Sequence, residues 1–323
     1  MKIGIIGVGT MGRVHAKCAV NSGMAEVTSV FDLVRENADK IASQYSAKAF
    51  TDIDEFLSSD IDMVFVCVPN TGHAEIAIKA LNAGKHVFCE KPLAISVEQV
   101  YSIKEAANKS GKRVFTGLNR RFAPVYKHSK DVVRQADYKP MNFHMLQNDG
   151  DMGGAVWVAH LDALGGFLYD STIHSLDMAE YMMGEVDKLW TLGISACYSL
   201  DDDFVIMLKF KSGGIGTITS CGHASWIYPF ERMQVVGDHR SIITEELETF
   251  RYCPSLTGVI EAAEYTKLPF EVKWGYQDMH KHMYDALLNG KKAENDLDVG
   301  IRSVRLVDAC YKSAAAGGKE IEV

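Results

Sequence analysis

The sequence lacks the features that mark secreted, metal-binding and membrane proteins. Its seven cysteines are scattered, and no two of them form the C-x-x-C pair found in many zinc and redox sites. No apolar run reaches the length of a transmembrane helix, and the chain starts with a strand pattern in place of a basic segment followed by an apolar signal sequence. These absences predict reduced thiols, no metal site and a cytoplasmic location.

Positive charge is also scarce. Lys and Arg total 34 against 42 Asp and Glu, which gives a formal net charge of -8 at pH 7. Such a surface repels nucleic acid and anionic lipid unless a local basic patch intervenes, and the sequence contains no such patch. We therefore expect a small-molecule partner, and neither a nucleic acid nor a membrane.

The chain is long enough for two hydrophobic cores, because it has 323 residues of which 47% are hydrophobic. Up to residue 118, short apolar runs alternate with amphipathic helical patterns, as in a parallel sheet with crossover helices. The predicted strands are KIGIIGVG, EVTSVFD, DMVFVCVP, KHVFCEKP and RVFTGLN. Residues 1–119 are therefore predicted to form a doubly wound α/β domain.

The rest of the chain has a different pattern. Residues 202–221 alternate apolar and polar side chains with period two, around a predicted turn at Gly213 and Gly214. Further apolar stretches predict more strands, so residues 120–323 are expected to form a second domain on a mostly antiparallel sheet. Within it, residues 147–166 are expected to be a variable loop. The pattern of a last amphipathic helix, residues 299–318, leaves open which domain it packs on.

A glycine pattern near the N-terminus predicts a nucleotide site. Gly7, Gly9 and Gly12 form G-x-G-x-x-G between a predicted strand and a predicted helix, where backbone N–H groups and the helix N-terminus can approach a pyrophosphate. Thr10 and Met11 lie within the same turn and complete the candidate set for the phosphates. The alternative is a glycine turn of some other doubly wound fold, and the order of strand, helix and a following acid favours nucleotide binding.

Two further residues extend this candidate site. Asp32 ends the second predicted strand, 20 residues after Gly12, where an acid binds ribose hydroxyls. A carboxylate there repels a 2′-phosphate and so favours NAD over NADP, although nearby Arg35 softens the preference. Asn70 follows another strand at the sheet edge where such folds hold ligands, and an ordinary loop role is the alternative for it.

The segment VFCEKPLA places Glu90, Lys91 and Pro92 directly after a predicted strand, and the proline restricts the backbone that carries the lysine. Oxidation of an alcohol needs a base for the hydroxyl proton while hydride leaves for the nicotinamide. A free lysine is a poor base at neutral pH, but the positive charge of an oxidised nicotinamide favours the neutral amine. Lys91 is therefore a candidate for proton exchange with a substrate oxygen, and a solvated surface lysine is the alternative.

A second candidate set lies in GGFLYDSTIHSLDMAEYMMGE. Asp170 and His174 are four residues apart, so on a helix they share one face. A histidine can accept or relay a proton near neutral pH, and a carboxylate beside it can orient it or bind a substrate hydroxyl. A structural hydrogen bond is the alternative for this pair, and Asp177 is the rival carboxylate.

Five stretches of the chain resemble the glucose-fructose oxidoreductase, inositol dehydrogenase and MocA family. They are GVGTMGRVHA, VPNTGHAEIAIKALNAGKHVFCEKPLA, GLNRRFAP, GGFLYDSTIHSLDMAEYMMGE and GIRSVRLVDACYKSAAAGGKEIEV. The resemblance covers essentially the whole chain. It implies an N-terminal Rossmann domain and a C-terminal α/β domain with a large open, mostly antiparallel sheet, with substrate in the cleft between them.

The resemblance also implies roles for individual residues. It assigns contact with a reacting sugar or polyol to Lys91, Asp170 and His174. It places Glu90 near the nicotinamide ribose and Arg121, in the NRRF segment, near the nicotinamide end. It further implies a homodimer or homotetramer that forms through the exposed face of the second sheet.

Several aromatic and polar residues are candidates for the substrate pocket, although each also suits a packing or loop role. They are Trp157, His160, Asp162, Trp226 and Tyr228. Aromatic faces beside hydroxyl-binding groups suit a sugar ring or a cyclitol.

Three functions fit these patterns. The first is an NAD-dependent dehydrogenase of a sugar, inositol or related polyol. The second is an enzyme that cleaves glycosides by transient oxidation with bound NAD followed by elimination. The third is a nucleotide-responsive binding protein, against which the joint presence of Lys91, Asp170 and His174 argues, because a sensor has no need of a proton-transfer set.

Overall fold

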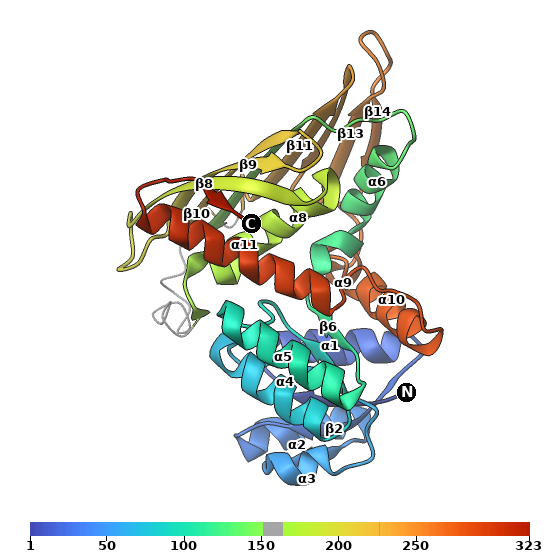
Figure 1. The fold of residues 1–323 in the computed structure, drawn as a ribbon. Helices are drawn as coiled ribbons and strands as arrows, with labels where there is room; N and C mark the ends of the chain where they lie inside the picture. The colour runs from blue at the N-terminus through green and yellow to red at the C-terminus, as the bar shows by residue number, and fades with distance from the viewer. Residues whose placement is uncertain (151–163, 226) are drawn as a thin grey trace. The chain divides into compact units, whose positions relative to one another are not determined.

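The computed structural model describes residues 1–150, 164–225 and 227–323. These residues form two compact units (Figure 1). The first unit consists of Met1–Asn119 and Tyr276–Val304, and the second of Arg120–Gly275 and Arg305–Val323. The chain thus leaves the first unit after Asn119 and re-enters it at Tyr276.

A six-stranded parallel sheet forms the centre of the first unit. Its strands are β1 (Lys2–Ile6), β2 (Glu26–Phe31), β3 (Lys48–Phe50), β4 (Met63–Val66), β5 (His86–Cys89) and β6 (Val114–Thr116). They lie in the order β3-β2-β1-β4-β5-β6, which is the strand order of a Rossmann fold. The order reverses between β1 and β4, so the loops after these two strands lie at the switch point where such sheets bind ligands.

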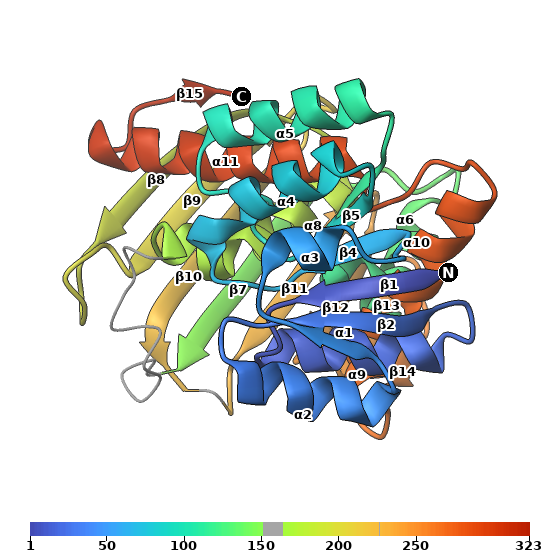
Figure 2. The ribbon, with the colours of Figure 1, turned by 90° about the horizontal axis from the view of Figure 1, so that it is seen from below.

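Helices cover this sheet. They are α1 (Thr10–Asn21), α2 (Arg35–Tyr45), α3 (Ile53–Leu57), α4 (His73–Asn82), α5 (Val97–Ser110) and α10 (Tyr276–Leu288). Helix α4 packs against α5, β4 and β5, while α1 packs against α10, β1, β2 and β4 (Figure 2). Strand β4 (MVFV) is apolar throughout, and Ile5, Phe65 and Phe88 are fully buried, as expected for parallel strands covered on both faces.

The second unit is built on a nine-stranded sheet. Its strands are β7 (Asn142–Gly150), β8 (Val186–Ile194), β9 (Asp203–Phe210), β10 (Ile215–Ala224), β11 (Glu231–Gly237), β12 (Arg240–Glu245), β13 (Thr249–Cys253), β14 (Glu261–Glu264) and β15 (Ile321–Glu322). They lie in the order β14-β13-β12-β11-β7-β10-β9-β8-β15. β7 and β10 are parallel and the other neighbours are antiparallel, which confirms the predicted open, mostly antiparallel sheet.

Helices α6 (Pro124–Val133) and α8 (Ile173–Met183) lie on one face of this sheet, together with the end of α11 (Leu297–Ala315) (Figure 1). The predicted alternation in β9 is confirmed, since Phe204, Ile206, Leu208 and Phe210 are buried. On the opposite face the exposed apolar side chains are Leu192, Ile194, Val205, Met207 and Ile215.

Two features of the chain differ from the sequence-based predictions. Residues 147–150 were expected to begin a variable loop, but they complete β7 and pair with β10 and β11. Residues 276–304 were assigned to the second domain, but they belong to the first unit. Both differences arise because strand pairing and helix packing depend on partners distant in sequence, which local patterns do not identify.

The returning segment fills the interior of the first unit. Met279, Met283 and Tyr284 of α10 are fully buried. Past the helix, Asn295 accepts a hydrogen bond from the N–H of Thr116 at 2.8 Å through its carbonyl, and its side chain donates to the carbonyl of Thr116 at 3.1 Å. The segment therefore contributes to the core and continues the hydrogen bonding of β6. Helix α11 begins in the first unit and ends in the second, which resolves the question that its pattern left open.

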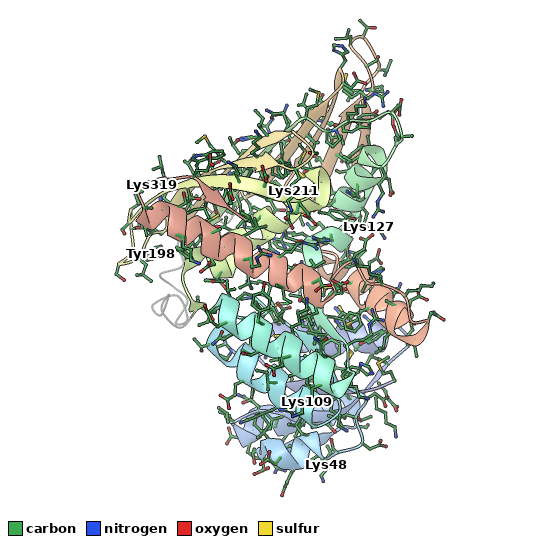
Figure 3. The ribbon with its side chains drawn as sticks, viewed as in Figure 1. Lys48, Lys109, Lys127, Tyr198, Lys211 and Lys319 are labelled. Atoms are coloured by element: carbon green, nitrogen blue, oxygen red, sulfur yellow. The ribbon has the colours of Figure 1, made fainter. Side chains whose placement is uncertain are left out.

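The surface is polar over much of both units. The five labelled lysines, Lys48, Lys109, Lys127, Lys211 and Lys319, are exposed and come from different segments (Figure 3). All seven cysteines lie in the described ranges, and none of them forms a disulfide bond. Among the helices of the described residues, none is long and apolar enough to cross a membrane.

Met283→Ala tests the contribution of the returning segment to the first unit. We expect it to lower the free energy of unfolding by about 2–5 kcal/mol, because it removes a fully buried side chain and leaves a cavity. Hydrogen exchange of peptides from residues 1–119 at increasing urea concentration measures the effect. Leu288→Ala, at a position 63% exposed on the same helix, is the matched control, and equal effects of the two changes would contradict the assignment.

Candidate functional site

The glycine turn after β1 has one open position and two crowded ones. Gly7 has φ +85°, and a Cβ atom on it would lie 2.5 Å from the carbonyl oxygen of Cys67. A Cβ atom on Gly12 would lie 2.0 Å from the carbonyl oxygen of Gly7. Around a Cβ atom on Gly9, by contrast, there is no described atom within 4 Å. Gly7 and Gly12 thus allow the tight turn and close packing, and Gly9 leaves room for a ligand against the backbone.

The N-terminus of α1 is available to an anion. Gly9 is the N-cap residue, it has no capping side chain, and the first turn contains no acidic residue. Thr10 is exposed and Met11 is half-buried at this end. Since the first N–H groups of a helix lack partners within it, they can bind a phosphate here. The turn therefore fits the pyrophosphate of a dinucleotide.

Asp32 lies just beyond β2, close to this turn. Its carboxylate accepts hydrogen bonds from the backbone N–H groups of Val8, at 3.2 Å, and Val34, at 2.9 Å. This places a fixed negative group beside the glycine turn, as ribose recognition requires. Arg35 pairs with Asp39 at 2.9 Å, so its guanidinium is engaged on the surface of α2. Asn70 is buried and begins the short 3₁₀ turn that follows β4.

Glu90 is held by a buried chain of hydrogen bonds that the sequence did not reveal. One carboxylate oxygen lies 2.6 Å from Nε2 of His15, and the other accepts the backbone N–H of Lys91 at 2.9 Å. Nδ1 of His15 lies 2.8 Å from Nε2 of His280, whose Nδ1 lies 3.2 Å from the hydroxyl of Tyr284. Four side chains from α1, the end of β5 and α10 thus form one connected network.

Glu90 and His280 differ in charge within this network. Burial alone would raise the pKa of Glu90, but the hydrogen bond and charge of His15, with the charge of Lys91, outweigh it and hold that pKa below its usual value. Burial, with His15 beside it, lowers the pKa of His280 well below the ordinary value. Glu90 is therefore an ionised group fixed on the backbone of Lys91, and His280 is neutral.

His73 connects the loops that follow β4 and β5. Its Nδ1 lies 2.6 Å from the carbonyl oxygen of Pro92, and its Nε2 lies 2.9 Å from the carbonyl oxygen of Val68. The ring is 1% exposed. This contact links the segment before Asn70 to the Lys91–Pro92 peptide, so two candidate segments of the first unit are held together.

In the second unit, Asp170 lies in a π-helical turn, Leu168–Thr172, that leads into α8. A regular α-helix was expected at this position, and the wider turn is a correction. Asp170 is the one partly exposed residue in the described stretch 166–179, whereas His174 is 7% exposed. Asp170 is thus the residue of this buried segment that reaches the surface, and π turns are frequent at functional sites.

The start of this turn is fixed by Tyr311 of α11, whose hydroxyl accepts the N–H of Leu168 at 3.0 Å. A Cβ atom on Gly166, at φ +101°, would lie 2.3 Å from the same hydroxyl oxygen. The glycine is therefore required for the close approach of Tyr311. Burial raises the pKa of Tyr311, so that its hydroxyl stays protonated.

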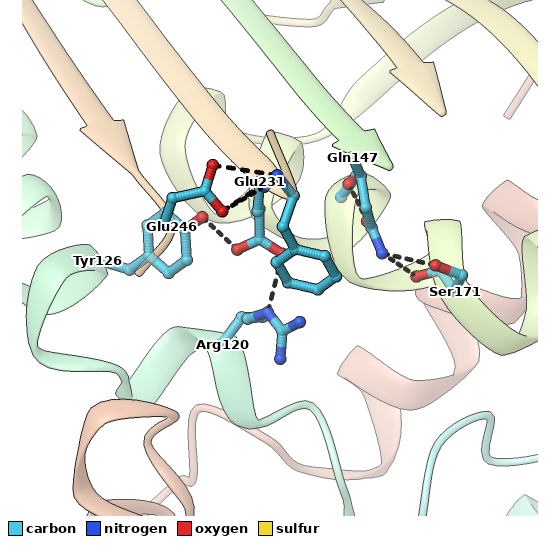
Figure 4. Close-up of polar contacts among 8 residues, drawn as sticks. Arg120, Tyr126, Gln147, Ser171, Glu231 and Glu246 are labelled. Carbon is cyan, nitrogen blue, oxygen red and sulfur yellow. Dashed lines mark hydrogen bonds and ion pairs between the residues drawn. The ribbon is translucent and has the colours of Figure 1, made fainter. Parts of the chain in front are cut away.

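Two buried ion pairs hold the arginines of the NRRF segment within the second unit. The guanidinium of Arg121 makes a two-point contact with Asp177, with Nε at 2.9 Å and a terminal nitrogen at 2.6 Å. Arg120 binds Glu231 at 3.1 Å, and Tyr126 donates its hydroxyl to the other oxygen of Glu231 (Figure 4). Asp177, the rival acid in the sequence, thus belongs to an ion pair, as does Arg121.

The predicted site residues fall into two groups. Gly7, Gly9, Thr10, Met11, Gly12, Asp32, Asn70, Glu90 and Lys91 lie in the first unit, and Arg121, Asp170 and His174 in the second. Tyr228 is 66% exposed. Trp157, His160, Asp162 and Trp226 lie outside the described residues. His15, His280 and Gln147 are polar residues with central positions that sequence reasoning missed, and for His15 the only local signal was its place in the helix after the glycine turn.

Comparison with known proteins adds family evidence to this geometry. An oxidoreductase family model with an NAD-binding Rossmann fold matches residues 1–118, and a model of the GFO/IDH/MocA C-terminal domain matches residues 139–243. The chain is 32% identical over 261 residues to the myo-inositol 2-dehydrogenase of Thermotoga maritima, which covers 76% of each chain. It is 26% identical over 336 residues to the inositol 2-dehydrogenase of Rhizobium meliloti, covering 98% of this chain and 97% of the relative.

A solved structure titled as levoglucosan dehydrogenase in complex with NADH and levoglucosan matches the whole fold. The TM-score is 0.90 at 20% sequence identity, with coverage of 100% of this chain and 99% of the other. At this identity, the match establishes a shared fold.

Gly9→Ala tests the role of the glycine turn in ligand binding without a change in folding stability. Because its added Cβ meets no described atom within 4 Å and φ is -63°, we expect an unchanged thermal midpoint. NADH binding, measured by titration calorimetry, is expected to weaken at least about tenfold, because the methyl group occupies the space next to the phosphates. Gly12→Ala is the contrasting variant and should lower the midpoint. Wild-type NADH affinity in Gly9→Ala would refute the assignment of this turn.

The His280 environment predicts a pH dependence of stability. The pKa of this histidine lies well below 6.5 in the folded state and near about 6.5 in the unfolded state, so below that pH only the unfolded chain takes up the proton. The free energy of unfolding is therefore not reduced by His280 above about pH 6.5. Below that pH, protonation of His280 in the unfolded chain lowers it by up to about 1.4 kcal/mol per pH unit.

His280→Gln tests this effect, because glutamine retains hydrogen-bonding atoms but does not titrate. Urea unfolding of the first unit at about pH 7.5 and about pH 5.5 is expected to show a smaller loss of stability at low pH in the variant than in the wild type. His73 and His86, whose pKa values are also lowered by burial, supply the dependence that remains. Equal losses in both proteins would show that His280 does not contribute.

Proposed function

Since the chain belongs to the Gfo/Idh/MocA family of NAD-binding oxidoreductases, we propose that it is a dehydrogenase of a sugar, an inositol or a related polyol. The observation that carries this proposal is the partly exposed Asp170 close in sequence to His174, in a chain whose glycine turn is open at Gly9. A carboxylate and an imidazole are the groups that bind and deprotonate hydroxyls. The names of the inositol dehydrogenase relatives support the same substrate class.

The first unit supplies the residues proposed to hold NAD. Gly7, Gly9 and Gly12, with the N–H groups at Thr10 and Met11, are placed for the pyrophosphate. Asp32 is assigned to the ribose hydroxyls, which favours NAD over NADP. Asn70 and Glu90 are proposed to contact the nicotinamide half. Arg121 is a weaker candidate, because Asp177 engages its guanidinium.

The proposed chemistry is removal of a hydride and a proton from one CH–OH group. A bound NAD would supply the acceptor for the hydride of the carbon. Nζ of Lys91 takes the proton from the hydroxyl oxygen as the C–O bond becomes a carbonyl, and returns it in the reverse direction. Glu90 accepts the N–H of Lys91 and so fixes the backbone from which this side chain extends.

Asp170 and His174 are proposed to bind the hydroxyls of the substrate. The imidazole of His174 has one nitrogen that can donate and one that can accept a hydrogen bond, and Asp170 can accept a hydrogen bond from a neighbouring hydroxyl. Asp177 is excluded from this role because it pairs with Arg121 in the interior.

We further propose a homodimer or homotetramer in the cytoplasm. The exposed apolar side chains of β8, β9 and β10 support this assembly, because Leu192, Ile194, Val205, Met207 and Ile215 lie on one face of the sheet. An apolar face of this kind is typical of a subunit interface.

Lys91→Ala tests the proposed proton transfer. We expect a loss of at least about 100-fold in kcat, because general acid–base catalysis contributes this much, with NADH affinity within a few-fold of wild type. Lys104→Ala is the control, since Lys104 is a surface lysine of the same unit paired with Asp298. A near-normal rate for Lys91→Ala would disprove the proposed role.

The substrate is identified by screening inositols, aldoses and simple glycosides with NAD and with NADP, while nicotinamide absorbance and product are followed together. Reduction of NAD with one polyol supports the proposal, and a higher rate with NAD than with NADP supports the role of Asp32. Cleavage of a glycoside without a net change in absorbance would contradict the proposed dehydrogenase and would support the oxidation and elimination mechanism.

A further inference from the structure

Three neighbouring strands of the second sheet carry a buried polar side chain at the same level. Glu231 of β11 and Ser220 of β10 are both register partners of Gln147 in β7. Glu231 is 0% exposed, and Ser220 and Gln147 are each 1% exposed. We call these three residues the polar row. Because buried polar groups are nearly always hydrogen-bonded, each member must find a partner in the elements that cover the sheet.

Gln147, the central member, binds the helical segment at two points. Its Nε2 donates to the carbonyl oxygen of Ser171 at 3.1 Å and to the Oγ of Ser171 at 2.7 Å (Figure 4). Its Oε1 accepts the hydroxyl of Ser175. Ser171 directly follows Asp170, and Ser175 directly follows His174. One amide side chain thus holds the neighbour of each member of the candidate pair.

Ser220 adds a third point of attachment. Its Oγ lies 2.8 Å from the Oγ1 of Thr172, the last residue of the π turn. Glu231, at the other end of the polar row, binds Arg120 and Tyr126. The polar row therefore attaches two segments to the sheet. Glu231 binds the segment of Arg120 and Tyr126, and Gln147 and Ser220 bind the segment that carries Asp170.

The contact with Ser171 also gives a reason for the π turn. A side-chain donor on a helical carbonyl competes with the regular hydrogen bond of that carbonyl, and such insertions distort helices. Ser171 lies inside the π turn, and its carbonyl accepts from Gln147. The wider turn occurs where Asp170 is the partly exposed residue of a buried stretch.

We propose that Gln147 is a positioning residue: its amide holds the π turn in the conformation that exposes Asp170 and sets the orientation of His174. The inference rests on the proposed function in that Asp170 and His174 act on the substrate. The structural part concerns only the second unit and can be measured without a substrate.

Gln147→Met is the primary variant, because methionine has a similar length and no hydrogen-bonding group of comparable strength. Hydrogen exchange of peptides covering residues 167–177 is expected to accelerate at least about tenfold, since the hydrogen bonds that hold this segment are lost. kcat is expected to fall at least about tenfold while the KM for NAD stays within about twofold. Met145→Leu, on the same strand and the same buried face, is the packing control and should leave both quantities unchanged.

Gln147→Glu tests whether the hydrogen bonds of this side chain, and not its packing, hold the turn. A protonated glutamic acid has one O–H donor for Ser171 and one acceptor for Ser175, whereas its carboxylate has no donor. Lowering the pH from about 8 to about 6 is therefore expected to restore exchange protection of residues 167–177 in Gln147→Glu, after correction for intrinsic rates, because burial favours the protonated acid. Gln147→Met should show no such recovery.

Two results would overturn the inference: wild-type exchange of residues 167–177 in Gln147→Met, or equal acceleration across the whole second unit. The second result would mean a loss of general stability. Failure of the proposed function is seen separately, as a wild-type protein that oxidises no polyol and reduces no sugar. In that case the exchange measurements still decide whether Gln147 holds the turn.

Discussion

The requirement that buried polar side chains be hydrogen-bonded determines where the candidate functional groups of this protein lie. In the first unit, the carboxylate of Glu90 is buried and is satisfied by His15 and by the backbone of Lys91. In the second unit, Arg121 and Asp177 satisfy each other in the interior. Since removal of one partner would leave a buried charge uncompensated, these contacts fix the backbones on which Lys91 and the helix of His174 are carried.

The same requirement connects segments that are far apart in sequence. His15 and His280 are 265 residues apart, and their contact joins the helix after the glycine turn to the returning helix α10. Gln147 and Ser171 join a strand to the π turn. In each unit, a candidate ligand-binding segment is thus supported by a polar contact with a rigid element behind it, and such support keeps functional groups in a defined geometry.

Much of the fold follows from local patterns. The alternating apolar runs identify β1, β2, β4, β5 and β6, and the period-two pattern identifies β9 and β10. The glycine turn and Asp32 were recognisable because G-x-G-x-x-G, strand, helix and acid have a fixed spacing in one short stretch. The roles of Lys91, Asp170 and His174 remain predictions.

Residues whose importance depends on distant partners could not be identified in this way. Gln147 was assigned to the start of a variable loop, yet its pairing with β10 and β11 places it in a strand. His280 lies on an amphipathic helix whose pattern is equally compatible with either unit. The π turn was missed because the helical spacing of Asp170 and His174 is the same in sequence whether the backbone is α or π.

The return of residues 276–304 to the first unit has a consequence for synthesis on the ribosome. A nascent chain that ends before Tyr276 contains the whole six-stranded sheet but lacks α10, so the apolar surface that α10 covers stays exposed to solvent and to other chains. The second unit likewise requires residues 305–323, because they include its edge strand β15. Neither unit can therefore complete its packing until the segment that returns to it, 276–304 for the first unit and 305–323 for the second, has left the ribosome.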